Sequence, residues 1–186
     1  MVFTYDTEAT LAFTATLVNS EPGVANSQVD QLDGIPSLER LLDANDYSGR
    51  RDLDLAELEE VRALRAEFRR LWAVDRDEAA TLVNTMLRET AALPQLVRHG
   101  DWDWHLHATA SDAPLAVRMR VEVAMAFIDV IRSDEYGRLR RCAADDCEGV
   151  LVDLSRNRSK RYCDAGNCGN RMNVNAYRAR LADDTP

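Results

Sequence analysis

The sequence predicts a mainly α-helical protein: a helical amino-terminal domain with one small β-hairpin, followed by a treble-clef-like, cysteine-rich module. Three observations support this prediction. Apolar residues recur at steps of three and four over residues 55–73, apolar and polar residues alternate over residues 102–107, and every cysteine lies within residues 142–168. We therefore divide the chain into a domain of residues 1–137, for which a sensory role is our hypothesis, and a module of residues 138–186.

The clearest predicted helix covers residues 55–73. Asp54, with Glu57 three residues later, resembles a capping box at its start. Residues three and four apart share one face of a helix, so the pattern predicts a continuous buried stripe. The stripe consists of Leu58, Val61, Leu64, Arg65, Phe68, Leu71 and Trp72.

Shorter patterns predict four further helices. One covers residues 7–19 and contributes Leu11, Phe13, Leu17 and Val18 to the core. Ser37 is expected to cap a short helix, and Asp77 to begin another that closes before Pro94. Asp112 is expected to cap a long helix. The inward residues of that helix are Leu115, Met119, Val123, Ala126, Phe127, Val130 and Ile131.

The alternating segment predicts a β-hairpin. Trp102, Trp104 and Leu106 form one face of a strand, with two histidines, His105 and His107, on the other. A turn at residues 100–101 would return the chain to residues 96–98. We expect the tryptophan face to enter the core, because large aromatic side chains are usually buried.

The four cysteines have the spacing of a metal site: Cys142-x4-Cys147, fifteen residues, then Cys163-x4-Cys168. Two close pairs joined by such a loop can bring four thiolates onto one tetrahedral Zn²⁺ ion. A four-cysteine site leaves no coordination position open, so the ion would be structural. Two disulfides are the alternative, and they require an oxidising compartment.

The order of elements around the cysteines indicates a treble-clef-like arrangement. Residues 149–153 are expected to form a strand after the first cysteine pair, and residues 160–162 a return strand. A terminal helix is expected over residues 171–181. Its Met172, Ala176 and Ala179 would pack on the hairpin.

Several segments of the chain resemble a known family. Residues 138–142 (RLRRC), residues 153–158 (DLSRNR), residues 161–163 (RYC) and residues 168–171 (CGNR) resemble the CGNR-type zinc finger. Residues 11–13 and 17–19 fit the ABATE domain that precedes this finger in bacterial stress-induced transcription regulators. The resemblance spans nearly the whole chain and implies a helical ABATE domain, a zinc finger and a role in transcription regulation.

Charge is divided unequally along the chain, and this favours DNA as a partner. Residues 138–180 contain ten basic and five acidic residues, a local charge of +5. Because the whole chain has a net charge of −9, the remaining residues together carry −14. On the terminal helix, Arg171, Asn175 and Arg178 share a face that could contact bases. The residues expected to bind phosphates are Arg156, Arg158, Lys160 and Arg161.

Other classes of function receive less support from the sequence. No apolar run is long enough to span a membrane, and the amino terminus does not resemble a signal peptide, so we expect a cytoplasmic protein. No phosphate-binding glycine loop, nucleophile elbow or HExxH motif is present, so we expect no enzyme activity. The alternatives are an adaptor whose finger binds a protein, and an enzyme with its pocket in the helical domain.

Sensing could involve a small-molecule effector or the zinc thiolates themselves. Asn19, Trp104 and His105 are candidates for the lining of an effector pocket. Oxidation of the thiolates would release the metal and unfold the finger. A single finger offers little contact area, so specific DNA binding could require a homodimer.

Overall fold

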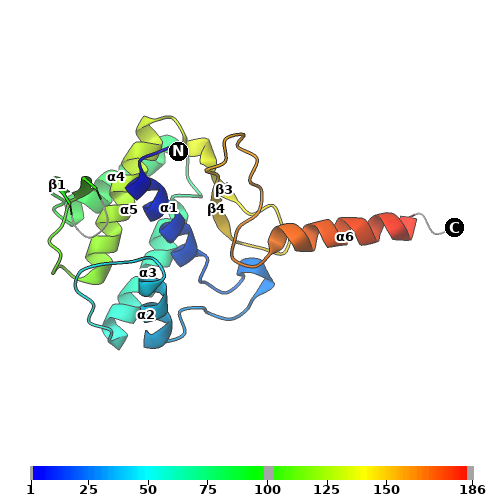
Figure 1. Ribbon diagram of the computed structural model, residues 1–186, viewed down its shortest axis with the longest axis horizontal. Coiled ribbons are helices and arrows are strands. Elements are labelled where there is room, and N and C mark those ends of the chain that lie inside the picture. Colours follow the sequence, from blue (N-terminus) through cyan, green and yellow to red (C-terminus); the bar gives the residue numbers. More distant parts are fainter. Residues whose placement is uncertain (1, 99–102, 184–186) are drawn as a thin grey trace.

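The structure, a computed structural model, describes residues 2–98 and 103–183 (Figure 1). The helices are α1 (Tyr5–Val18), α2 (Ile35–Asp43), α3 (Leu55–Arg70), α4 (Arg76–Glu89), α5 (Leu115–Arg132) and α6 (Cys168–Asp183). The strands are β1 (Gln95–Val97), β2 (His105–His107), β3 (Leu139–Arg141) and β4 (Val150–Val152), and 3₁₀ turns occur at Val24–Asn26 and Tyr136–Arg138. The predicted fold class, mainly α with a small hairpin and a cysteine-rich module, is confirmed.

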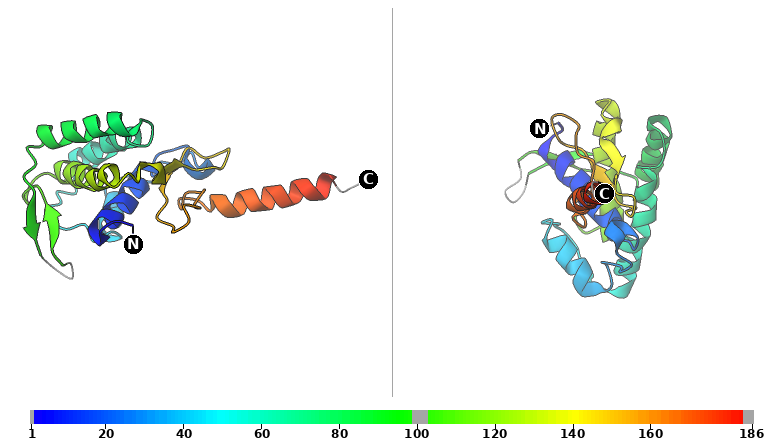
Figure 2. Two further views of the ribbon diagram at one scale, coloured as in Figure 1. Left: turned by 90° about the horizontal axis from the view of Figure 1, so that it is seen from above. Right: turned by 90° about the vertical axis from the view of Figure 1, so that its right-hand side faces the viewer.

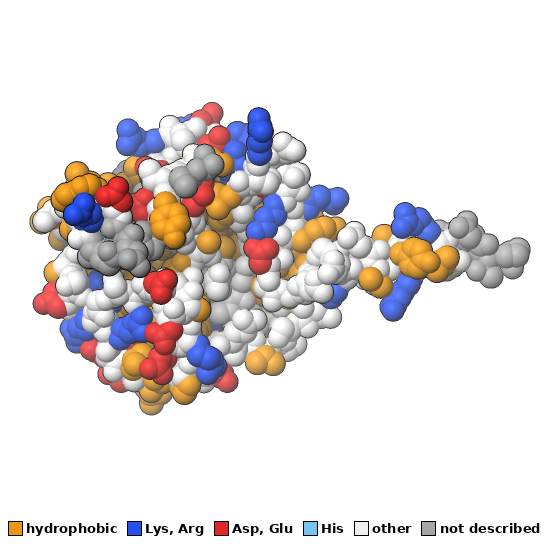
Figure 3. Space-filling view, viewed as in Figure 1, with side chains coloured by type: hydrophobic (Ala, Val, Ile, Leu, Met, Phe, Trp, Pro, Cys, Tyr) orange, Lys and Arg blue, Asp and Glu red, His pale blue; other side chains and the backbone are white. Residues whose placement is uncertain are grey.

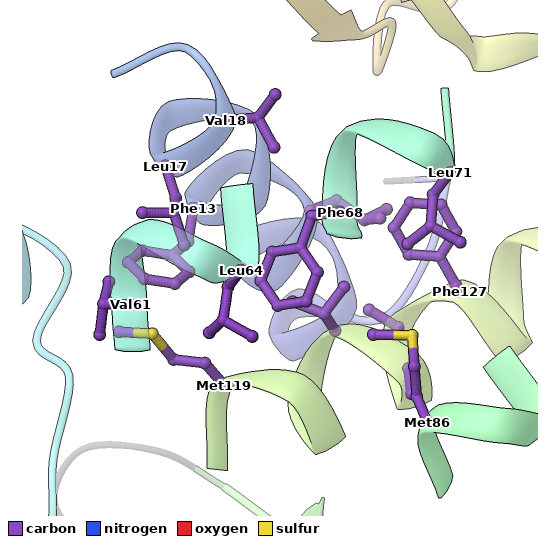
Figure 4. Packing of buried hydrophobic residues seen from close by; sticks show 14 of the residues in the cluster. Phe13, Leu17, Val18, Val61, Leu64, Phe68, Leu71, Met86, Met119 and Phe127 are labelled. Carbon is purple, nitrogen blue, oxygen red and sulfur yellow. The ribbon is translucent and has the colours of Figure 1, made fainter. Parts of the chain in front are cut away.

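The core of the helical domain forms around α5, which packs against α1, α3 and α4. Figure 4 shows side chains from these helices meeting in one layer, with Phe68 and Phe127 fully buried. The edge of Phe127 also meets Trp72, with ring centroids 5.6 Å apart. Every member of the stripe predicted on α3 is buried.

Arg65 is the one charged member of that stripe. Its guanidinium group donates two hydrogen bonds to Asp30, at 2.7 and 3.0 Å. This two-point ion pair satisfies a charge that would otherwise be costly to bury.

Helices α3 and α4 each begin with an aspartate that accepts hydrogen bonds from backbone N–H groups. The second of them differs from the sequence prediction. Asp54 accepts a hydrogen bond from the Glu57 N–H at 2.8 Å, as predicted. The prediction that Asp77 begins α4 is wrong by one position, because the helix begins at Arg76. Its cap is Asp75, which accepts from the N–H groups of Asp77 and Glu78.

The caps predicted for α2 and α5, two helices that begin next to a proline, are also wrong. Ser37 lies within the first turn of α2, where its hydroxyl bonds to the backbone of Gly34, the actual N-cap. Pro114, rather than Asp112, is the N-cap of α5. A proline needs no hydrogen-bond acceptor for its nitrogen, so a helix can begin beside it without a side-chain cap.

The β1–β2 hairpin is confirmed, with Leu96 opposite Leu106 and Val97 opposite His105. The predicted turn at residues 100–101 and Trp102 lie outside the described residues. The prediction that the tryptophan face enters the core is wrong for Trp104, which is 63% exposed and has the Arg98 guanidinium over its ring. Alternation shows which residues share a face, but packing decides which face is buried.

In the cysteine module, β4 pairs with β3, the strand before the first cysteine pair. The return strand predicted at residues 160–162 is therefore wrong. Among the described residues, a backbone hydrogen bond from the Ala143 N–H to the Arg161 carbonyl links that segment to the first cysteine pair. Because β3 already lies against β4, residues 160–162 remain an irregular connection.

Helix α6 extends away from the rest of the molecule (Figure 1 and Figure 2). It begins at Cys168, and every residue from Asn173 to Leu181 is exposed. Met172 packs against the cysteine cluster, but the prediction that Ala176 and Ala179 pack on the hairpin is wrong. None of the helices in the described ranges has both the length and the hydrophobicity that a membrane crossing requires.

Candidate zinc site and basic helix

The four cysteines converge at the base of α6. Their sulfur atoms all lie within 4.8 Å of one another, and the Cys163 Sγ is 3.7 Å from the Sγ atoms of Cys147 and Cys168. A tetrahedral ion with Zn–S bonds of about 2.3 Å requires sulfur separations of about 3.8 Å. A disulfide would need about 2.05 Å, so these free cysteines fit a metal and not two disulfides.

Backbone N–H groups point at the sulfur atoms. The Ala25 N–H donates to the Cys147 Sγ at 3.1 Å, and the Gly149 N–H donates to the same atom at 3.3 Å. The Cys163 N–H donates to the Cys142 Sγ at 3.4 Å. Such donors stabilise the negative charge of thiolates that bind a metal.

Two profiles of known families match the chain. The one described as "ABATE: Putative stress-induced transcription regulator" covers residues 9–134, and the one described as "CGNR zinc finger" covers residues 138–181. The chain belongs to the ABATE family. No curated protein matches it. Sulfur geometry and family together establish one structural zinc ion, held by Cys142, Cys147, Cys163 and Cys168.

Glycine is required at one position of the CGNR finger. A Cβ atom at Gly149 would lie 3.0 Å from the Cys163 Sγ and 3.1 Å from the Cys147 Sγ. These separations are too short for ordinary contact, and the sulfur atoms cannot retreat while they bind the metal. Sequence reasoning had no signal for the shorter of these contacts, because Gly149 and Cys163 are distant in the chain.

The ABATE domain contributes a loop to the finger. Ala25, in the 3₁₀ turn after α1, donates to the Cys147 sulfur, and the Gly23 carbonyl accepts from the Glu148 N–H at 3.2 Å. Ala25 has a positive φ of 54°, a left-handed conformation that is unusual for alanine. The zinc site is therefore assembled by both parts of the chain.

Arg171, the last residue of the CGNR segment, belongs to the surroundings of the zinc site. Its guanidinium donates to the Cys168 Sγ at 3.2 Å and forms an ion pair with Asp146. The sequence placed it with Asn175 and Arg178 as a base contact. The structure leaves those two exposed, whereas Arg171 is engaged beside the metal.

Asp153 holds residues 153–160, which include the DLSRNR segment, in their loop conformation, a role that sequence reasoning missed. This fully buried carboxylate accepts from the Ser155 hydroxyl and N–H groups and, at 3.0 Å, from the Lys160 N–H. Burial alone would raise the pKa of Asp153, but these hydrogen bonds and the Arg140 charge lower it. The carboxylate thereby organises the loop that presents Arg156 and Arg158.

The residues predicted to bind DNA fall into two groups. Arg158 pairs with Glu135, Lys160 with Asp164, and Arg171 with Asp146. Within the described residues, five exposed basic side chains of the finger form no ion pair. They are the predicted Arg156, Arg161 and Arg178, and also Arg141 and Arg180, which the sequence analysis did not select.

The three predicted pocket residues do not share one pocket. Asn19 is buried, and its amide exchanges two hydrogen bonds of 2.8 Å with the backbone of Val150. It therefore joins α1 to β4, beside a cleft of about 390 Å³ between α1 and the finger. His105 lines a separate cavity of the ABATE domain, and Trp104 lines neither space.

Proposed function

We propose that this protein is a cytoplasmic transcription regulator that binds DNA through α6, with the ABATE domain as its sensory part. The observation that supports the proposal is the exposure of this basic helix, which extends clear of an acidic body (Figure 1). Figure 3 shows acidic and basic side chains mixed over this face of the body, whereas the coloured part of the projecting helix carries basic and no acidic side chains. The free cysteines suit a reducing compartment.

The dimensions of α6 suit the major groove, which is about 12 Å wide and admits one helix. At about 100° per residue, Arg171, Asn175 and Arg178 lie within about 60° of one another around the helix axis. Asn175 and Arg178 would contact base edges, since amide and guanidinium groups match adenine and guanine. Arg156 and Arg161 would contact phosphates at the base of the helix.

Selection of bound duplexes from a random DNA pool, at low and at moderate salt, tests this proposal. We expect an enriched sequence and an affinity that falls steeply with salt, by a log–log slope of about −0.9 per phosphate contacted. Arg178→Ala should lose the enriched sequence, whereas Arg40→Ala, an exposed arginine of the ABATE domain, should retain it. Absence of binding at both salt concentrations would refute the proposal.

Arg171 provides a further prediction. Arg171→Ala should weaken zinc binding about 10- to 100-fold, because partners of metal ligands commonly have effects of that size. Arg178→Ala should not change zinc binding, since Arg178 is exposed and distant from the sulfur atoms along the helix. Competition with a chromogenic chelator measures both. Equal zinc affinity in the two variants would show that Arg171 does not support the site.

A second candidate function is protein binding, and one observation favours it. Val174, Tyr177 and Leu181 are about half exposed and form a stripe about a quarter-turn from the basic face. Such a stripe suits a partner helix, including α6 of a second copy. Light scattering with and without DNA distinguishes the candidates: an adaptor or a homodimer would depend on Tyr177 and not on Arg178.

The proposal assigns no catalytic step to the chain. A zinc ion with four thiolate ligands has no open position at which to activate water. Hydrolysis or redox turnover that survives replacement of the cysteines would argue for an enzyme in the ABATE domain.

A further inference from the structure

A cavity of about 410 Å³ lies in the ABATE domain between α1, α5, strand β2 and the segment that follows α2. This volume is within the range of sites that hold small organic molecules. Its walls include four carboxylates, Asp6, Asp46, Glu122 and Asp129, and one arginine, Arg132. Phe13, Met125 and Ala126 contribute apolar surface. The cavity is therefore both acidic and partly apolar.

Glu122, on α5, is one of these carboxylates and forms no ion pair with any described residue. Burial raises its pKa, and the Tyr47 hydroxyl together with the charges of Arg118 and His105 act in the opposite direction. Arg118, one turn earlier, is the nearby cation, and its guanidinium is held by the backbone carbonyls of Ala113, Ser48 and Arg50. The Glu122 carboxylate therefore has a positive charge nearby but forms no ion pair within the described chain.

Tyr47 provides an independent observation on the same wall. Its side chain is only 9% exposed, and its hydroxyl lies beside the Glu122 carboxylate but forms no hydrogen bond of ordinary geometry among the described residues. Burial and the neighbouring Glu122 carboxylate raise the pKa of Tyr47. A buried hydroxyl without a well-placed partner is destabilising unless something else binds it. It therefore marks a position where a ligand atom would be stabilised.

Two histidines close another side of the cavity. The Nε2 atoms of His105 and His107 are 3.0 Å apart, and the His105 Nδ1 is 2.7 Å from the Asp103 carbonyl oxygen. These two contacts fix the orientation of both rings against the cavity wall.

We propose that this cavity binds a small organic cation, with an ammonium group between Glu122 and the Tyr47 hydroxyl and an apolar body against Phe13, Met125 and Ala126. The ammonium donates to the carboxylate and to the phenolic oxygen, which satisfies both buried groups. An anion would meet the net negative charge of the wall. A metal ion lacks a ligand set, because the cysteines are the only metal-binding group found among the described residues.

Calorimetry with the full-length, zinc-loaded protein tests the proposal. The probes are benzylamine, 2-phenylethylamine and cyclohexylamine, each compared with its neutral alcohol counterpart. We expect at least one amine to bind about tenfold or more tightly than its alcohol, because an ion pair in a partly buried site exceeds the corresponding neutral hydrogen bond. The proposal is overturned if no amine binds with a Kd below about 10 mM, or if amine and alcohol bind equally.

Variants then locate the site. Glu122→Gln keeps the size of the side chain and should reduce amine affinity about tenfold or more, whereas Glu60→Gln, on the exposed face of α3, should have no effect. Tyr47→Phe removes only the hydroxyl and should also weaken amine binding. It serves as the second variant in case Glu122→Gln does not fold. Unchanged amine affinity in both folded variants would place the binding elsewhere and refute the assignment.

This inference rests on the ABATE domain being the sensory part of the proposed regulator, but the binding measurement needs no DNA. Amine binding without DNA binding would refute the regulator and retain the pocket. DNA binding by a protein that binds no amine would refute the proposed pocket and retain the regulator.

Discussion

The ABATE domain and the CGNR finger are stabilised by different physical means. The domain buries a continuous set of apolar side chains from α1, α3, α4 and α5. The cluster in the finger consists of Cys142, Ala144, Leu151, Cys163 and Cys168, with a few half-buried neighbours. So small a cluster cannot offset the entropy of an ordered chain, and the metal must supply the difference.

Strand β4 connects these two regions. Val150 and Val152 belong to the core of the ABATE domain, whereas Leu151, between them, belongs to the cysteine cluster. Successive residues of a strand point to opposite faces, so three residues can serve both cores. The Trp72 indole N–H strengthens the connection with a 3.0 Å bond to the Leu151 carbonyl. The finger and the domain therefore have separate buried clusters, and β4 with its Trp72 hydrogen bond connects them.

Removal of zinc should have the largest effect and should separate the two regions. Cys163→Ser, or a strong chelator, should unfold the finger, because binding of a structural zinc contributes about 10–16 kcal/mol to folding. The helical signal of the ABATE domain should persist in circular dichroism. Unchanged zinc content in the variant would contradict the assignment of ligands.

Phe68→Ala should act mainly on the domain. Phe68 is fully buried, and its truncation should lower the free energy of unfolding by about 3–5 kcal/mol. Arg70→Ala, an exposed change at the end of the same helix, should change it by less than about 0.5 kcal/mol. Chemical denaturation measures both. A small loss in Phe68→Ala would mean that the core around α5 repacks.

Asn19→Ala should weaken the connection without removing either core. It deletes both hydrogen bonds to Val150 and leaves buried backbone groups unpaired, at a cost of about 1–3 kcal/mol. Hydrogen exchange of the Val150 amide should accelerate, whereas exposed Asn84→Ala should leave it unchanged. Equal exchange in both variants would show that Asn19 does not join the regions.

A pH-dependent effect, the smallest expected, concerns the ion pair between Asp30 and Arg65. The hydrogen bond from Arg65 lowers the pKa of Asp30, so the pair stabilises the fold above the ordinary carboxyl pKa of 3.8. That contribution is lost as the pH falls through the lowered value. Because Asp30 is partly exposed and the amide oxygen of an asparagine can still accept from the buried Arg65, Asp30→Asn should cost only about 1 kcal/mol at neutral pH. Stability measured against pH should show the difference vanishing in acid, and a constant difference would contradict this origin.

Several features could be determined from the sequence alone. The stripe on α3 and the cap at Asp54 depend on residues within one or two turns, so periodicity and spacing suffice to identify them. The zinc ligands follow from cysteine spacing, because each pair is local and the chemistry of thiolates restricts the partner. The helical class and the four-cysteine site were therefore predicted correctly.

Other features required the tertiary structure, because they depend on contacts between distant parts of the chain. Alternation over residues 102–107 could not show that Trp104 faces outward and the histidines face the cavity. Strand propensity could not show that β4 pairs with β3 and not with residues 160–162. The sequence predicted which face of the helix Arg171 occupies, but not its hydrogen bond to the Cys168 Sγ or its ion pair with Asp146. Local periodicity determines which side chains share a face, whereas only the folded chain determines what each face meets.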